Sequence, residues 1–381
     1  MDLSLRKANY HLKYRTRYAY LLLSTNVGQR KQDGVMNRFC MNLLKVISLS
    51  LGLTVTSCYA ISNINVYYYN GNDNYINLFA RFLGKLSERS PLNFKFYDAQ
   101  NRHQEQLENI ITGLYSGSPA IVNLVDVNDA PKVLEAAKDS GSKVVFVNRL
   151  PADSALSSYD DCWYVGVNSE QSGVFIADEI DDYFKTVSHY DKNKNGQLDM
   201  VILQGEKFHQ DTFNRTVMTV TKLKEKGYPL NIISKNYDNW DRNNAKQDLL
   251  KQIDLVGISN IEIVVANNDA MALGALDALK SLGYNTDVKD KEHYIPVFGV
   301  DGLPEMLKEV EAGRATGTLF SDFSALAKVC YEIATSDAQT DEEVTQLVWY
   351  KTENHKTLLP YIKIASFKNY MKQKYTPPYK R

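Results

Sequence analysis

From Ile64 onward, short apolar runs alternate with amphipathic stretches, and this alternation restricts the fold more than any other feature of the sequence. Short apolar strands separated by amphipathic helices predict parallel sheets that are covered by helices on both faces. The alternation occurs twice, before and after about Val167, so we expect an α/β fold of two similar doubly wound lobes. The expected strands are Ile64–Tyr69, Ala120–Val125, Lys143–Asn148, Met200–Gln204, Ile261–Ala266, Pro296–Val300 and Thr316–Phe320, and the expected helices are Asn74–Leu86, Gln104–Tyr115, Pro131–Lys138, Ser172–Phe184, Asp269–Leu282 and Pro304–Glu311.

Length and composition agree with a two-domain globular protein. The chain has 381 residues, which is more than a single compact core usually holds. Its apolar content of 44% and its charged content of 23% are ordinary for a soluble protein. A net charge of -1 provides no general attraction to nucleic acid or to an anionic membrane surface, so neither is an expected partner.

The N-terminal region carries an expected export signal. The stretch 43–55 is mostly apolar, follows Arg38 and is too short to span a bilayer comfortably, which is typical of a secretory signal. Met36 is a better start for this signal than the first methionine, because it leaves a short basic lead. We therefore interpret 36–60 as a signal peptide and expect a periplasmic protein. Residues 1–35 are either an over-extended reading frame, which we favour, or a tail of unknown use.

The four residues Val55-Thr56-Ser57-Cys58 resemble a bacterial lipobox, in which a cysteine is lipidated after cleavage. Valine in place of the commoner leucine weakens the match, and plain cleavage after Ala60 is the alternative. Cys162 and Cys330 remain in the folded part, on segments that look buried. An exported protein can oxidise such a pair, but we favour free, buried thiols.

Polar clusters directly follow several expected strands. In open parallel sheets, ligands bind outside the carboxyl ends of the strands. This rule marks five binding candidates, which are Tyr69–Tyr75, Asn148–Arg149, Glu206–Arg215, Asn267–Asp269 and Asp301.

The segment Asp191–Asp199 predicts a calcium-binding loop. Its side chains that carry oxygen occupy loop positions 1, 3, 5 and 9, which are Asp191, Asn193, Asn195 and Asp199. Gly196 at position 6 permits a sharp turn, and Gln197 offers its backbone carbonyl at position 7. This is the arrangement of an EF-hand loop, which supplies the hard oxygen ligands that Ca²⁺ prefers.

The loop then departs from the EF-hand pattern. Ile202 stands where the bidentate glutamate belongs, and the loop leads into a strand rather than a helix. Another carboxylate is therefore needed, and Glu262 can provide it if the strand Ile261–Ala266 pairs beside Met200–Gln204. We expect a structural calcium site; the alternative is a polar turn that binds no metal.

From about Ile64 to the C-terminus, the chain resembles the periplasmic galactose/glucose-binding proteins of sugar ABC transporters, which have the type 1 periplasmic binding protein fold. The matching motifs are Asn123-Leu-Val-Asp, Val144-Val-Phe-Val-Asn148, Tyr164-Val-Gly, Gln204-Gly-Glu, Val265-Ala-Asn-Asn-Asp-Ala-Met-Ala, Val297-Phe-Gly-Val-Asp301-Gly-Leu-Pro-Glu305 and Leu359-Pro-Tyr361. The calcium loop and its remote glutamate also match in position.

The resemblance implies a set of sugar-binding residues. Carboxylates would accept hydrogen bonds from hydroxyls, amides would both donate and accept, and a guanidinium would hold two sugar oxygens. An aromatic ring on each side would cover the apolar faces of a pyranose. The implied residues are Asp73, Tyr75, Asn148, His209, Asp211, Arg215, Trp240, Asn268 and Asp301. The family prefers phenylalanine where Tyr75 stands; a stacking face is kept, but the added hydroxyl needs a partner. It prefers asparagine where the shorter Ser321 stands, which puts the preferred sugar in doubt.

The resemblance also implies a mechanism, in which two lobes close on one monosaccharide without breaking a bond. The lobes would comprise 61–166 plus 322–358 and 167–321 plus 359–381, with crossovers near Val165–Asn168, Phe320–Phe323 and Leu358–Tyr361. The implied partners of this monomer are D-glucose or D-galactose, an ABC permease and a chemoreceptor.

Two other functions fit parts of the sequence. A sugar hydrolase would also need paired carboxylates in a cleft. A sugar-responsive transcription regulator shares the two-lobed fold, but it needs a helix-turn-helix ahead of the lobes. An apolar export signal stands there instead, which disfavours the regulator.

Overall fold

The computed structural model describes residues 63–187, 190–287 and 289–364. The predicted extension 1–35, the signal peptide 36–60 and the lipidation site at Cys58 all lie outside these ranges. No helix within the described residues is long and apolar enough to cross a membrane. Cys162 and Cys330 are buried free thiols, which confirms the state that we favoured.

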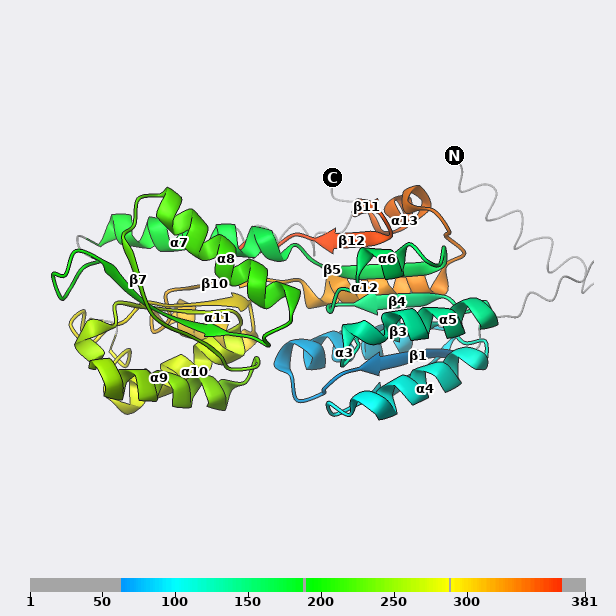
Figure 1. Ribbon diagram of the computed structural model, residues 1–381, viewed down its shortest axis with the longest axis horizontal. Coiled ribbons are helices and arrows are strands. Elements are labelled where there is room, and N and C mark those ends of the chain that lie inside the picture. Colours follow the sequence, from blue (N-terminus) through cyan, green and yellow to red (C-terminus); the bar gives the residue numbers. More distant parts are fainter. Residues whose placement is uncertain (1–62, 188–189, 288, 365–381) are drawn as a thin grey trace, which may run out of the picture. The chain divides into compact units, whose positions relative to one another are not determined.

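The first lobe is built on a seven-stranded sheet with the order β11-β12-β5-β4-β3-β1-β2 (Figure 1). All neighbouring strands in it are parallel except β11 and β12. Its strands are β1 (Asn63–Tyr68), β2 (Asn93–Asp98), β3 (Ala120–Val122), β4 (Val144–Val147), β5 (Cys162–Val167), β11 (Thr352–Glu353) and β12 (Lys356–Leu359).

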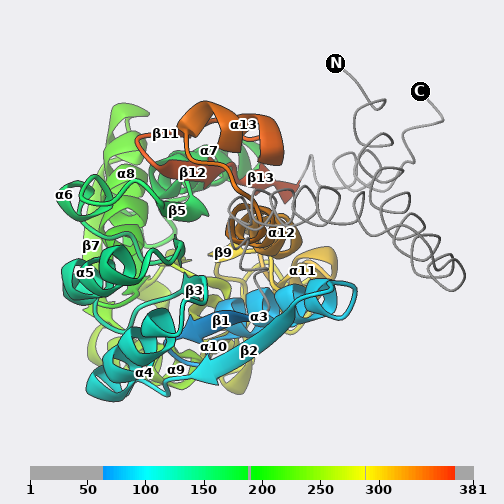
Figure 2. The ribbon, with the colours of Figure 1, turned by 90° about the vertical axis from the view of Figure 1, so that its right-hand side faces the viewer.

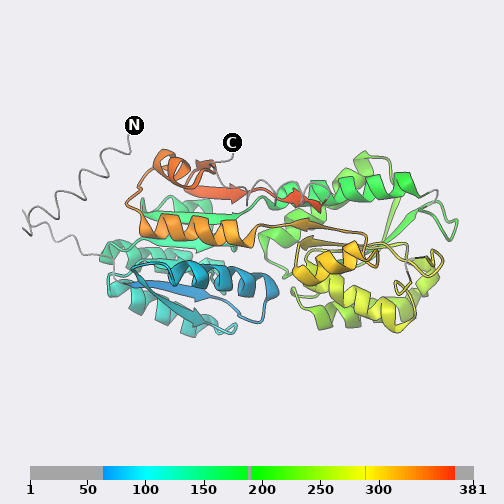
Figure 3. The same ribbon diagram turned by 180° about the vertical axis from the view of Figure 1, so that it is seen from behind.

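Helices cover both faces of this sheet because its strands are apolar on both sides. In β4, Val145 and Val147 pack into the core that includes α3 and α12, whereas Val144 and Phe146 pack into the core that includes α4 and α5. The two helix pairs lie on opposite sides of the sheet (Figure 2), and α12 lies along α3 (Figure 3). The helices of this lobe are α3 (Asn74–Ser87), α4 (His103–Tyr115), the 3-10 helix η1 (Val127–Asp129), α5 (Ala130–Ser140), α6 (Asp153–Leu156), α12 (Phe323–Thr335) and α13 (Asp341–Val348).

The second lobe is built on a six-stranded sheet with the order β13-β10-β9-β8-β6-β7. It is parallel except for β13, which pairs antiparallel with β10. Helix α7 packs on α8, and α9 packs on α10. The elements of this lobe are α7 (Ser169–Thr186), β6 (Leu198–Gln204), α8 (Gln210–Glu225), β7 (Leu230–Tyr237), α9 (Arg242–Val256), the 3-10 helix η2 (Ile258–Asn260), β8 (Ile263–Ala266), α10 (Asp269–Ser281), β9 (Val297–Asp301), α11 (Pro304–Glu311), β10 (Gly317–Phe320) and β13 (Ile362–Lys363).

These two α/β lobes confirm the predicted fold class. The chain passes from one sheet to the other after β5, after β10 and after β12. The seven expected strands are all present, with ends that differ by a few residues. One such difference concerns Glu262, which lies just before β8 rather than inside the strand, although β8 does pair beside β6 as expected.

Candidate functional site

The ends of several strands and the starts of the following helices surround one pocket. The pocket spans about 330 Å³, part of which is open to solvent. The lining residues are Tyr69, Asp73, Tyr75, Asn148, Arg149, His209, Asp211, Arg215, Trp240, Asn268 and Asp301. The structure therefore brings together all nine residues that the sequence suggested, and it adds Tyr69 and Arg149.

Asp73 joins the pocket to the start of α3. Its Oδ1 accepts hydrogen bonds from the backbone N–H groups of Tyr75 and Ile76, at 2.8 and 3.1 Å, so the carboxylate caps the helix. Its Oδ2 accepts a hydrogen bond from the Tyr69 hydroxyl at 2.5 Å. The helix cap and the tyrosine together hold the carboxylate in one orientation.

Tyr75 contributes a ring from the first turn of α3. The ring packs edge-on against Phe323, with ring centres 5.0 Å apart. Its hydroxyl lies 3.2 Å from Ser321 Oγ, and both groups are buried. Burial raises the pKa of Tyr75, so the hydroxyl keeps its proton. The hydroxyl partner that Tyr75 requires is therefore Ser321, which does not itself line the pocket.

The turn after β4 presents Asn148 and Arg149. Asn148 has a φ of 65°, a left-handed conformation that asparagine tolerates better than most residues. Its Oδ1 accepts a hydrogen bond from Asn123 Nδ2 at 3.2 Å, and its backbone carbonyl accepts one from the Tyr164 hydroxyl at 2.8 Å. These contacts, all within the first lobe, hold the Asn148 amide at the pocket.

His209 and Asp211 lie at the start of α8 in the second lobe. His209 Nδ1 accepts a hydrogen bond from the backbone N–H of Asp211 at 3.1 Å, so the ring proton is on Nε2. Burial lowers the pKa of His209 to about 4, helped by Arg149 and Arg215 and opposed by Asp211. His209 is consequently a neutral hydrogen-bond donor at physiological pH.

Arg215, one helical turn beyond Asp211, is the central cation of the pocket. Its Nη2 donates to Asp211 Oδ2 at 3.0 Å and to the Tyr361 hydroxyl at 2.7 Å. Its Nη1 donates to the backbone carbonyl of Asn267 at 2.5 Å and lies 3.6 Å from Asp301 Oδ1. A guanidinium held by these groups has a fixed orientation, with a hydrogen bond to Asp211 and a longer ion pair to Asp301.

Trp240 forms an aromatic wall of the pocket. It has a φ of 64°, and its ring packs edge-on against His209 at 5.1 Å. The indole lies directly on Gly205, where a Cβ atom would come within 2.2 Å of Trp240 Cη2. Asn268 Nδ2 donates to the Trp240 backbone carbonyl at 3.4 Å. Only glycine at position 205 leaves room for the ring in this position.

Asn268 and Asp301 complete the second-lobe side. Asn268 Oδ1 caps α10 by accepting from the backbone N–H of Met271 at 2.9 Å. Asp301 ends β9 with a φ of 125°. Burial raises the pKa of Asp301 well above its usual value, with Arg215 opposing this and Asp269, Asp73 and Asp211 adding to it. Asp301 and its neighbouring carboxylates thus crowd around one guanidinium.

The loop Asp191–Asp199 brings polar side chains together at the far end of β6. Asp191 accepts from the backbone N–H groups of Asn195 and Gly196 at 2.9 Å each, and Gly196 has the expected positive φ of 82°. Asn193 Nδ2 and Asn195 Nδ2 lie 2.7 and 2.6 Å from Asp199 Oδ2. Two amide side chains of the loop therefore meet at the Asp199 carboxylate, each through its nitrogen.

Glu262 closes this loop. Its carboxylate accepts hydrogen bonds from the backbone N–H groups of Lys192, Asn193 and Asp199. Within the described residues, no three carboxylate, imidazole or thiol groups converge as metal ligands. A cation here would also need amide and carbonyl oxygens from the loop.

Some residues at or near the pocket are important because of the side chains that they contact, and the sequence did not single them out. Tyr69 and Arg149 fell inside the candidate ranges at strand ends, but no rule singled them out from their neighbours. Glu206 lies in a candidate range too, and its importance depends on its ion pair with Arg149. Tyr361 contacts Arg215 from the last crossover; it belongs to the matching motif Leu359-Pro-Tyr361, but the motif does not indicate this contact.

Comparisons with known proteins agree with this geometry. A family model described as a periplasmic binding protein domain matches residues 64–342. The D-galactose/methyl-galactoside binding periplasmic protein of Haemophilus influenzae is 30% identical over 317 residues, covering 83% of this chain and 93% of that protein. A putative rhizopine-binding protein of Rhizobium meliloti is 26% identical over 240 residues, covering 61% and 69% of the two chains.

Solved structures show the same fold. An ABC transporter solute binding protein from Bacillus halodurans C-125 with bound myo-inositol matches with a TM-score of 0.64 at 22% identity, covering 83% of this chain and 99% of that one. A galactofuranose binding protein matches with a TM-score of 0.65 at 17% identity, covering 82% and 98%.

Proposed function

Because the chain belongs to the periplasmic binding protein family of non-enzymatic solute receptors, we propose that it captures one hexose, glucose or galactose, and delivers it to an ABC permease. The observation that carries this proposal is the composition of the pocket. Buried carboxylates, a fixed guanidinium and a tryptophan face converge in one space. Hydroxyl groups on a ring with apolar C–H faces match such a lining. The galactoside-binding name of the Haemophilus relative supports the choice of hexose.

Each group in the pocket has a proposed role toward the sugar. Asp73, Asp211 and Asp301 accept hydrogen bonds from hydroxyls, and Arg215 holds two sugar oxygens. His209 donates through Nε2, and the amides of Asn148 and Asn268 donate and accept. Trp240 and Tyr75 cover the two faces of the ring.

Capture by closure of the lobes is the proposed mechanism. Asp73, Tyr75 and Asn148 come from the first lobe, whereas His209 to Asp301 come from the second lobe. A ligand that contacts both sets of residues stabilises the arrangement in which they face each other. The crossovers after β5, β10 and β12 are the segments that bend.

Calorimetric titration with a panel of monosaccharides tests this proposal. We expect one hexose to bind with a 1:1 stoichiometry and Trp240→Ala to weaken its binding. No binding of any hexose would overturn the proposal. Incubation with aryl glycosides provides a second test, because a purified solute receptor should release no aglycone.

We also propose that calcium binds at Asp191, Asn193, Asn195, Gln197, Asp199 and Glu262. The Asn193 and Asn195 amides lie beside Asp199, where rotation of each amide would turn its oxygen toward a cation, and Gly196 provides the sharp turn. Both features support the site. Calcium would tie the loop to the start of β8, whose far end leads to Asn268. We expect added Ca²⁺ to raise the melting temperature of wild type after chelator treatment, and to do so far less in Glu262→Gln. Equal shifts in the two proteins would exclude Glu262 as a ligand.

Export to the periplasm and lipidation of Cys58 complete the proposal. A lipid anchor would leave the binding lobes free to reach a permease and a chemoreceptor. Metabolic labelling with a fatty acid analogue should mark wild type but not Cys58→Ser. Absence of label from both would favour simple cleavage after Ala60.

A further inference from the structure

An ion pair joins the two lobes beside the pocket. Arg149 Nη2 donates to Glu206 Oε1 at 2.8 Å. Arg149 follows β4 in the first lobe, and Glu206 follows β6 in the second lobe. The two residues therefore come within hydrogen-bond distance only when the two lobes face each other in the arrangement seen here.

Arg149 is held in place by the first lobe alone. Its Nη1 donates to the backbone carbonyl of Val125 at 3.0 Å, and its guanidinium carbon lies 3.8 Å from the centre of the Tyr69 ring. The Tyr69 hydroxyl in turn donates to Asp73. These contacts do not depend on the second lobe, so the guanidinium is already oriented before closure.

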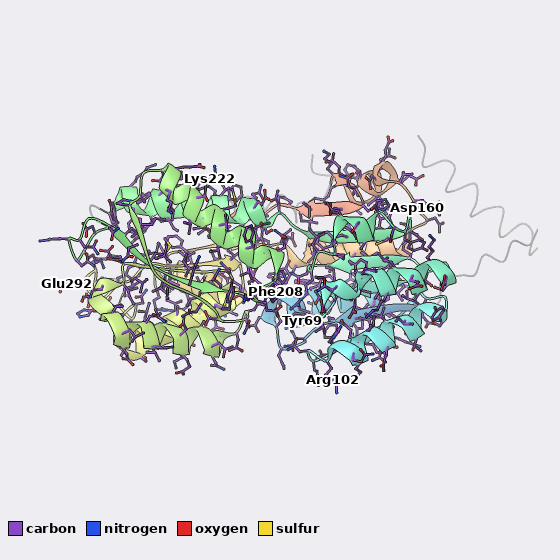
Figure 4. The ribbon with its side chains drawn as sticks, in the orientation of Figure 1. Tyr69, Arg102, Asp160, Phe208, Lys222 and Glu292 are labelled. Atoms are coloured by element: carbon purple, nitrogen blue, oxygen red, sulfur yellow. The ribbon has the colours of Figure 1, made fainter. Side chains whose placement is uncertain are left out.

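Glu206 is the more exposed partner. Its side chain is 33% exposed, against 8% for Arg149, and it does not line the pocket. Its backbone carbonyl accepts from the N–H of His209 at 3.2 Å, so Glu206 moves together with the turn that carries His209. The same region is visible in Figure 4, where Tyr69 and Phe208 are labelled.

We propose that the Arg149–Glu206 ion pair is a latch that forms on closure and sets the rate of ligand release. This inference rests on the proposed function, because it concerns the same pocket. Arg149 acts as a positioning residue: it connects Glu206 of one lobe, through Tyr69, to the Asp73 carboxylate of the other. A partly buried, charge-assisted hydrogen bond mainly affects dissociation when it is broken.

Glu206→Gln tests the latch, since it removes the charge and leaves every pocket-lining residue in place. We expect the dissociation rate of the hexose, measured by stopped-flow fluorescence, to rise about tenfold with an association rate within about twofold of wild type. The same substitution in an Arg149→Met background should cause no further increase. Glu309→Gln is the matched control, because the Lys280–Glu309 pair at 2.8 Å lies within the second lobe.

A measurement without ligand makes the test independent of the sugar. A pair of fluorescent labels, one on each lobe, reports the closed fraction of the free protein, which we expect Glu206→Gln to lower. An unchanged dissociation rate, or an equal rise in Glu309→Gln, would overturn the latch. Absence of hexose binding by wild type would overturn the proposed function. The latch is tested separately on the ligand-free proteins, where an unchanged label distance in Glu206→Gln would overturn it.

Discussion

Gly205 provides a direct test of how the aromatic wall is built. A Cβ at this position would lie 2.2 Å from Trp240 Cη2 and Cζ2, whereas carbon atoms in contact are separated by about 3.5 Å. Gly205→Ala must therefore move the indole by about 1.3 Å, the difference between these distances. The ring also packs edge-on against His209, 5.1 Å away between ring centres, so a displaced ring also disturbs a predicted sugar donor.

A displacement of this size should remove much of the contact between the indole and a sugar. A gap of 0.5–1 Å already loses about a quarter to a half of the dispersion energy, and a well-buried aromatic contact is worth about 1.5–3 kcal/mol. A quarter to a half of that energy is about 0.4–1.5 kcal/mol, so we expect the hexose Kd of Gly205→Ala to rise about twofold to tenfold, measured by calorimetric titration.

The control for Gly205 is Gly84, because a Cβ there meets no atom within 4 Å. Gly84→Ala lies in the last turn of α3, and we expect unchanged sugar affinity with slightly higher helix stability. A second variant separates the steric effect from unfolding: in a Trp240→Phe background, Gly205→Ala should cost much less affinity. Equal affinities of wild type and Gly205→Ala would refute the packing argument.

Three further predictions concern ionisable groups. The pKa of His209 is lowered to about 4 by burial, below its unfolded value of about 6.5. The stability that the neutral ring contributes is therefore present above about pH 6.5 and is lost as the pH falls toward 4. The melting temperature of His209→Gln should fall less than that of wild type over this range; parallel curves would contradict the prediction. Burial raises the pKa of Asp238 to about 7, and Asp248 adds to the effect. The contribution of protonated Asp238 is complete below about pH 4 and is lost as the pH rises to 7. Asp238→Asn should thus stabilise the protein more at pH 8 than at pH 4, by at most about 4 kcal/mol, and an equal gain at both pH values would refute this. Burial also raises the pKa of Cys162 and Cys330, so a thiol reagent should modify them only after denaturant is added; modification of the native protein within minutes would contradict their burial.

The sequence predicts central strands better than edge strands, for a physical reason. Strands β4 and β8 are buried along their whole length, and such strands consist of continuous apolar residues. Strands β2 and β7 lie at sheet edges and are largely exposed or half-buried, so polar residues interrupt their apolar pattern. Neither strand is among the seven that the sequence predicts.

The sequence likewise predicted some parts of the pocket better than others. The rule for strand ends located the segments of every pocket residue except Trp240, which follows the unexpected strand β7. The family resemblance supplied Trp240 and selected residues within the other segments. Arg149 and Tyr69 were not selected because their importance depends on partners that folding brings near. For Arg149, that partner is Glu206, 57 residues away. Ion pairs over such separations leave no periodic signal in a single sequence.

Backbone conformation at the pocket departs furthest from what local sequence would suggest. Asn148, Trp240 and Asp301 have φ values of 65°, 64° and 125°, and a side chain in such a conformation costs about 1–3 kcal/mol, least for asparagine. Each is held by tertiary contacts: Asn148 by Asn123, Trp240 by its carbonyl contact with Asn268, and Asp301 by Arg215 and by its backbone carbonyl, which accepts from the N–H of Ser321. A relaxed turn at these positions would point the same side chains elsewhere. Tertiary contacts thus override the local backbone preferences of three residues that the proposed ligand needs. Second-lobe contacts with Asn268 and Arg215 keep two of them, Trp240 and Asp301, in place.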